Sequence, residues 1–125
     1  MPRIERDEQR EERIHMDVIV DAHGPEEQIM GWYYYLQEKV GFPFAARCIQ
    51  ERTISPLHVG EVVEVQGMAD VDDCQVEMFV IIEWSNRTFG VPLMQLEGVG
   101  VDAETAEAIA DWHYWIGRGY QLCGW

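Results

Sequence analysis

Four short strand-like segments follow one another in the middle of the chain, and their spacing limits the possible folds. They are rich in Val, Ile, Phe and Trp, and they extend over residues 44–53, 61–69, 76–84 and 88–93. The connections "SPLHVG", an acidic loop and "SNR" are too short for the crossovers that a parallel sheet needs. The sequence therefore predicts a small antiparallel β-barrel.

A long amphipathic helix is expected before these strands, over residues 25–40. Pro25 suits the first helical position, and Glu26 and Glu27 lie in the first turn, where the helix dipole favours anions. Apolar residues then recur at helical spacing: Ile29, Trp32, Tyr33, Leu36 and Val40. This aromatic stripe is typical of a helix that packs on a core.

A second helix is expected after the strands, with Asp102 as its N-cap. The residues predicted to face the barrel are Ala106, Ile109, Ala110, His113 and Ile116. Glu104, Glu107 and Asp111 would then lie in water.

The first part of the chain has a different pattern. Residues 3–12 are helix formers with almost no apolar stripe, so we expect a solvated helix there. From Ile14 to Val20 apolar and polar residues largely alternate, which predicts a half-buried strand. The expected arrangement is one α+β domain over residues 1–125, with a helix, strand and long helix in 1–41, the barrel in 42–97, and a helix and tail in 98–125.

The charge of the chain restricts its partners. It has 23 acidic and nine basic residues and a net charge of −14. Nucleic acid is excluded as a partner, because binding it requires Lys and Arg, and cations or basic proteins are the natural complements. No membrane-spanning run or signal peptide is seen, and three cysteines without CxxC spacing argue against a disulfide framework. We therefore expect a cytoplasmic protein.

The stretch "GMADVDDC" contains the densest group of carboxylates. Asp70, Asp72 and Asp73, with Glu77 just beyond, form an oxygen-rich set of the kind that Ca²⁺ prefers. The stretch is not an EF-hand, because the positions that need Gly and a bidentate Glu hold Gln75 and Ile81. The alternative is a solvated turn, since Asp favours turns by bonding to nearby backbone.

Two further groups of acids are weaker candidates. Asp21, Glu26 and Glu27 meet at the start of the long helix, where helix capping explains them equally well. Asp17 is about 13 Å from Asp21 along the predicted strand, and Glu38 is about 17 Å from Glu27 along the helix. One ion therefore cannot bind either pair directly.

Enzymatic chemistry finds little support in the sequence. Acid–base catalysis by paired carboxylates needs one member of the pair to be desolvated. The candidate carboxylates of this chain lie in segments that we expect to be exposed to solvent. No nucleophile motif or phosphate-binding loop is present, and the histidines show no zinc-binding spacing. We therefore expect a protein that is not an enzyme.

Long stretches of the chain resemble one family, the small acidic non-EF-hand calcium-binding proteins of the cyanobacterial CcbP type. They are "RIERDEQREERIHMDVIVDA", "EEQIMGWYYYL", "FPFAARC", "VGEVVEVQGMADVDDCQVEMFVIIEW", "VPLMQLE" and "AIADWHYWIGRGY". The resemblance implies an SH3-like barrel with flanking helices that buffers or sequesters intracellular calcium.

The ligands expected from this chain's own residues are the acidic clusters. Asp70, Asp72 and Asp73 are the first choice with Glu77 beside them, and the second choice is Asp17, Asp21, Glu26, Glu27 and Glu38. The alternative function is an SH3-like interaction module that docks a basic partner, with calcium regulation as an option. The docking surface would be its acidic face or a groove formed by its five tryptophans and five tyrosines.

Overall fold

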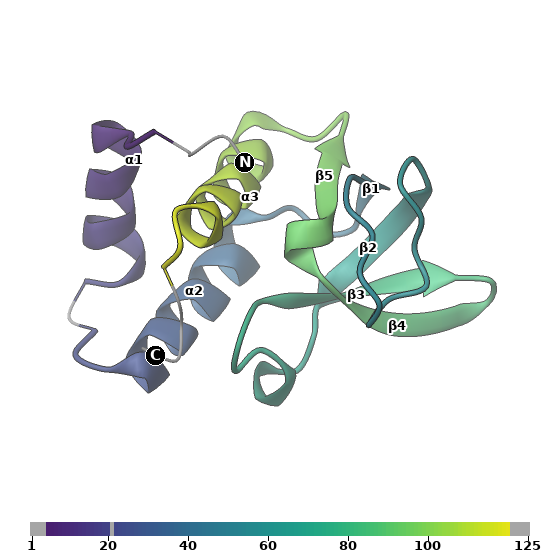
Figure 1. Cartoon of the computed structure of the whole chain (residues 1–125), viewed down its shortest axis with the longest axis horizontal. Helices are drawn as coiled ribbons and strands as arrows, with labels where there is room; N and C mark the ends of the chain where they lie inside the picture. The colour runs from purple at the N-terminus through teal and green to yellow at the C-terminus, as the bar shows by residue number, and fades with distance from the viewer. Residues whose placement is uncertain (1–4, 21, 121–125) are drawn as a thin grey trace.

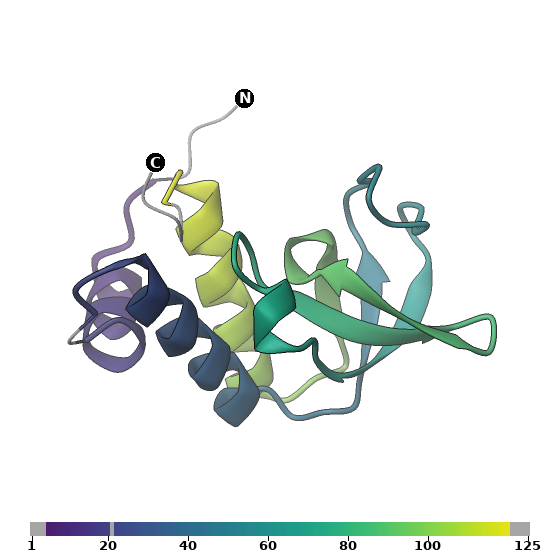
Figure 2. The same ribbon diagram turned by 90° about the horizontal axis from the view of Figure 1, so that it is seen from below.

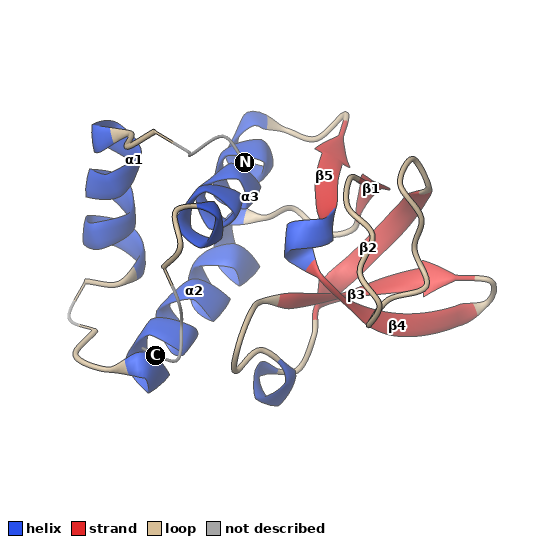
Figure 3. Ribbon diagram, viewed as in Figure 1, coloured by secondary structure: helices blue, strands red, loops and turns tan. Residues whose placement is uncertain are grey.

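The computed structural model describes residues 5–20 and 22–120, and in them helices pack beside an antiparallel sheet (Figures 1 and 3). The helices are α1 (Glu8–Arg13), the π-helical turn η1 (Ile14–Val18), α2 (Pro25–Lys39), the 3₁₀ turns η2 (Val71–Asp73) and η3 (Leu93–Gln95), and α3 (Ala103–Gly117). The strands are β1 (Phe44–Cys48), β2 (Val62–Met68), β3 (Phe79–Trp84), β4 (Arg87–Pro92) and β5 (Leu96–Val99). The α+β class predicted from the sequence is confirmed.

The sheet has the strand order β4-β3-β2-β1-β5, and all its neighbours are antiparallel. The β3–β4 hairpin turns at Ser85 and Asn86. Their positive φ angles of 51° and 63° are typical of the two-residue turn that joins the strands of a twisted hairpin. No ladder joins β4 to β5 within the described residues, so the hydrogen bonds leave the sheet open at these two edges. The predicted antiparallel sheet is confirmed, and its closure into a barrel is not.

The strand boundaries differ from the predicted ones by more than one residue at two places. The segment expected over 44–53 ends at Cys48, and the segment expected from residue 76 begins at Phe79. Strand β5 was not predicted at all. It has only four residues, "LEGV", directly after a 3₁₀ turn, which is too short for a period-two pattern to identify.

The strand predicted for residues 14–20 is wrong, because α1 continues into the π-helical turn η1. Ile14 and Val18 are buried while Met16 is 62% exposed, so the buried residues recur every four positions rather than every two. Gly31 of α2 allows the two backbones to cross there. A Cβ at this position would lie 2.3 Å from the carbonyl oxygen of Val18.

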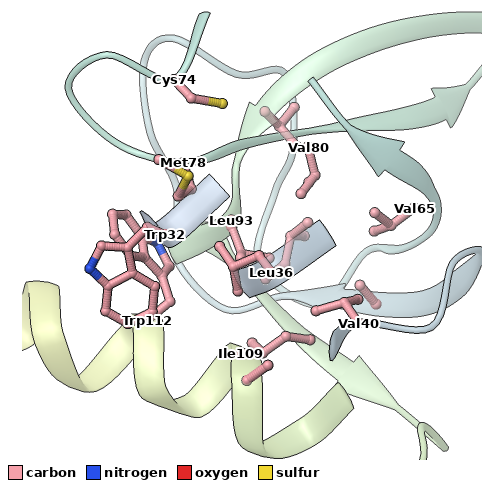
Figure 4. Close-up of a cluster of buried hydrophobic side chains, with 14 of the residues drawn as sticks. Trp32, Leu36, Val40, Val65, Cys74, Met78, Val80, Leu93, Ile109 and Trp112 are labelled. Atoms are coloured by element: carbon pink, nitrogen blue, oxygen red, sulfur yellow. The ribbon is translucent and has the colours of Figure 1, made fainter. Parts of the chain in front are cut away.

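The core lies between the sheet and the pair α2 and α3, which lie side by side next to it (Figure 2). Pro25 at the helix start and the Asp102 N-cap are as predicted, and Asp102 accepts a hydrogen bond from the Thr105 amide at 2.7 Å. Figure 4 shows the buried side chains that meet here, which include Trp32, Leu36, Val40, Val65, Val80, Leu93, Ile109 and Trp112. None of the helices within residues 5–20 and 22–120 is long and apolar enough to cross a membrane.

The prediction that Asp111 lies in water is wrong, since its side chain is fully buried. Arg10 and Arg13 of α1 each donate to Asp111 Oδ1 at 2.6 Å, and the Tyr35 hydroxyl donates to Oδ2 at 2.8 Å. Ala106, expected to face the barrel, is exposed instead. Helix α1 is therefore held to α3 by ion pairs rather than by an apolar stripe. Because the sequence shows no such stripe, it predicted a solvated helix.

Candidate functional site

The acidic loop connects β2 to β3 and contains the 3₁₀ turn η2, the short blue turn at the bottom of Figure 3. Asp70 caps this turn, because its Oδ1 accepts a hydrogen bond from the Asp72 amide at 3.0 Å. The Asp73 amide donates to the Asp70 carbonyl oxygen at 2.9 Å. The alternative raised by the sequence, a turn stabilised by its own Asp, is thus part of the structure.

The base of the loop is anchored on both sides. The Tyr33 hydroxyl of α2 donates to the Ala69 carbonyl oxygen at 2.7 Å, and the buried Cys74 sulfur accepts from the Phe79 amide at 3.3 Å. Burial raises the pKa of the Cys74 thiol, and the carboxylates of Asp73 and Asp70 raise it further. The anchored base holds the three aspartates together on the surface. Their charges produce a negative electrostatic potential there.

The three aspartates of the loop are exposed. None of them forms an ion pair with any part of the chain that the structure describes. Glu77 differs, because the Arg52 guanidinium meets its carboxylate at 2.8 Å, and this hydrogen bond raises the pKa of Arg52. A cation could therefore approach the aspartates freely, whereas at Glu77 it would have to displace Arg52.

The donor set fits Ca²⁺ by its chemistry. Carboxylate and backbone carbonyl oxygens are hard ligands, and Asp70, Asp72 and Asp73 supply them within one short turn. Among residues 5–20 and 22–120, however, no group of three or more His, Cys, Asp or Glu side chains is already arranged to hold a metal ion. The carboxylates of the loop would have to move together around an ion. The free energy needed for this rearrangement would lower the affinity.

The second group of acids is distributed over two neighbouring pockets. Asp17 and Glu38 line one pocket of about 480 Å³, although the sequence placed each of them apart from the other acids. Glu26 and Glu27 line the next pocket, of about 440 Å³. Asp21, the remaining member of this group, lies outside the described residues.

Two carboxylates outside the predicted ligand groups are buried, Glu11 and Asp111. Glu11 accepts hydrogen bonds from the hydroxyls of Tyr114 and Tyr120, and Asp111 is paired with arginines. Their partners already occupy them, so they are not candidates for a cation. The one signal in the sequence is the spacing of Arg10 and Arg13, which places both on one face of a helix.

Comparisons with known proteins agree on one group of relatives. A family model described as calcium binding, Calci_bind_CcbP, matches residues 12–116. The chain is 42% identical to Anabaena CcbP in its crystal structure, with a TM-score of 0.85 over 96% of this chain and 98% of that one. It is 41% identical to a calcium-binding protein in the calcium-binding form, with a TM-score of 0.83 over the same shares. No curated protein matches the chain.

Proposed function

The chain belongs to the CcbP family of calcium-binding proteins, and on this basis we propose that it binds Ca²⁺ through exposed surface carboxylates. The aspartates of the loop, Asp70, Asp72 and Asp73, are the first ligands, with carbonyl oxygens of the same turn beside them. The acids of the two pockets are the second group. The cellular role that follows is buffering of free calcium in the cytoplasm.

One observation carries this proposal. Every described candidate carboxylate except Glu77 is exposed and has no ion pair among the described residues. In a chain with a net charge of −14, such groups repel one another and concentrate cations around them. Ca²⁺ relieves this repulsion most where several carboxylates lie within one turn.

The geometry supports weak, reversible binding. Because the carboxylates must converge when the ion arrives, part of the binding free energy is spent on ordering the loop. We therefore expect a Kd of about 10⁻⁵ M or weaker, as for flexible rather than rigid oxygen sites. Such a site suits a buffer, which releases its ion when the free concentration falls.

Further assignments accompany this function. The return of β5 to pair with β1 supports an SH3-like barrel, and the core shared by helices and sheet supports a single domain. The wet environment of the aspartates supports a binding role rather than catalysis. Cys48 and Cys74 are buried and free, which suits a reducing cytoplasm.

A calorimetric calcium titration in low and high salt tests this function. Raising the salt from about 0.15 M to about 1 M shortens the Debye length from about 8 Å to about 3 Å. Chelation predicts a saturable heat that survives in high salt, and a much smaller heat with Mg²⁺, which gives up its water reluctantly. Diffuse attraction predicts that the heat disappears in high salt, and that result would remove the proposed function.

A further inference from the structure

Exposed apolar side chains gather beside the π-helical turn. Met16 is 62%, Val20 51% and Tyr34 57% exposed. Met16 and Tyr34 line the same pocket, and Val20 lines the neighbouring one. These side chains therefore belong to one stretch of surface and are not scattered singly.

The two pockets together form a groove along the crossing of η1 and α2, which we call the η1–α2 groove. Val18 and Gly31 line both pockets, so the pockets meet where the backbones cross. Met30 is a second methionine that lines the groove. Methionine is flexible and polarisable and adapts to the shape of an apolar partner.

The rim of the groove is acidic. It consists of Asp17 and Glu38 in one pocket and Glu26 and Glu27 in the other, against the single base Lys39. None of these four carboxylates forms an ion pair within the part of the chain that the structure describes. The groove thus combines exposed apolar side chains with carboxylates that no ion pair among the described residues neutralises.

This combination selects one kind of occupant. The net charge of −14 repels nucleic acid, anionic lipid and a second copy of the chain. Calcium would bind the carboxylates and leave Met16, Val20 and Tyr34 in water. A basic amphipathic segment satisfies both features, because its apolar face fills the pockets while its Lys and Arg face the rim.

We propose that the η1–α2 groove docks a basic amphipathic helix of another protein. Glu27 and Glu38 are about 17 Å apart along α2 at 1.5 Å per residue. A partner helix of about three turns would therefore reach from one acidic pocket to the other. This function is separate from calcium binding at the loop, which uses other residues, whereas the rim carboxylates are also the second group of proposed calcium ligands.

A synthetic peptide tests the proposal. The probe is a fluorescent helix of about 14 residues with alternating pairs of Lys and Leu, which is about 21 Å long when helical. Its partner is the full chain in excess calcium chelator, with fluorescence anisotropy as the readout. A peptide with the same Lys residues but Ala in place of Leu measures attraction by charge alone. Because chelator is present, the result does not depend on the calcium site.

Two variants of the groove separate docking from general attraction. The charge variant is Glu26→Gln, Glu27→Gln and Glu38→Gln, and its control removes the same charge elsewhere through Glu12→Gln, Glu83→Gln and Glu104→Gln. The apolar variant is Met16→Ser and Val20→Ser, and its control is Ile54→Ser and Val59→Ser. All four apolar residues are more than half exposed, so these changes leave the core intact.

Docking predicts that the charge variant weakens binding about tenfold, and that its control weakens it less than about threefold. It also predicts about a fivefold loss in the apolar variant and none in its control, and weak binding of the Ala peptide. Equal losses in variant and control, equal binding of both peptides, or no binding of the Leu peptide would each overturn the proposal. A concentration-dependent dimer that excludes the peptide would do the same, by assigning the groove to a second copy.

Discussion

Asp111 joins three helices through one buried carboxylate. It lies on α3, accepts hydrogen bonds from Arg10 and Arg13 of α1, and accepts another from Tyr35 of α2. Burial and the hydrogen bond to Asp111 raise the pKa of Tyr35, so the hydroxyl keeps its proton and remains a donor. One side chain therefore positions the N-terminal helix.

Replacing Asp111 by Asn should destabilise the fold strongly. The variant removes the buried counterion of both arginines and leaves them only the exposed Asp7 and Glu107, at 3.7 and 3.6 Å. Breaking a buried pair in this way costs about 3 kcal/mol or more. Urea denaturation in chelator measures the free energy of unfolding. The control is Glu107→Gln, because Glu107 is half exposed and lies 3.6 Å from Arg13, and it should cost less than about 0.5 kcal/mol. Similar costs for both variants would show that the buried pair does not hold α1.

A second residue-scale prediction concerns His113, whose Nε2 lies 3.1 Å from the Leu93 carbonyl oxygen. Burial lowers the pKa of His113 in the fold below its ordinary value of 6.5. As the pH falls through 6.5, the unfolded chain binds a proton that the fold does not, so the free energy of unfolding decreases. Above that pH the residue has no such effect.

The measurement is urea denaturation in chelator at several pH values from 7.5 to about 5.5. His113→Gln should show a shallower decline than the wild type over this window. Parallel declines would mean that other groups cause the pH dependence.

At the scale of elements, periodicity predicted α2, α3 and four of the strands, because their apolar residues repeat along the chain. It failed for η1, where the alternation of apolar and polar residues predicted a strand but helix α1 continues. The arginines of this helix bind Asp111, about a hundred positions away. It also failed for β5, which is defined by pairing with β1 rather than by its own four residues. Local patterns contain no information about such distant partners.

Gly31 tests the crossing of η1 and α2. Gly31→Ala brings a methyl group to 2.3 Å from a backbone oxygen, so η1 must move. We expect a loss of about 1–3 kcal/mol in the free energy of unfolding, although Ala is the better helix former. Gly67→Ala is the control, since nothing lies within 4 Å of its new Cβ, and it should be close to neutral. A neutral or stabilising Gly31→Ala would contradict the close crossing.

The whole molecule explains why the sequence located the candidate site only in part. Asp70, Asp72 and Asp73 are neighbours in the sequence, so the sequence alone was enough to group them as candidate ligands. Asp17 and Glu38 share a pocket only because η1 crosses α2, and Glu77 is occupied only because Arg52 lies beside it. Neither fact follows from spacing along the chain.

The central claim is that the loop binds calcium by chelation and not through the overall charge. It is tested most directly by calorimetric calcium titration of two variants that remove the same charge. One is Asp70→Asn, Asp72→Asn and Asp73→Asn, in which Asn still caps the η2 turn. The other is Glu12→Gln, Glu83→Gln and Glu104→Gln, at exposed positions elsewhere.

Chelation predicts that the loop variant either loses the saturable heat or binds calcium at least about tenfold more weakly, which equals about 1.4 kcal/mol. The control should stay within about threefold of the wild type, because it changes only the screened field. Equal titrations for the two variants, or a loop variant that binds like the wild type, would contradict the assignment of Asp70, Asp72 and Asp73 as ligands.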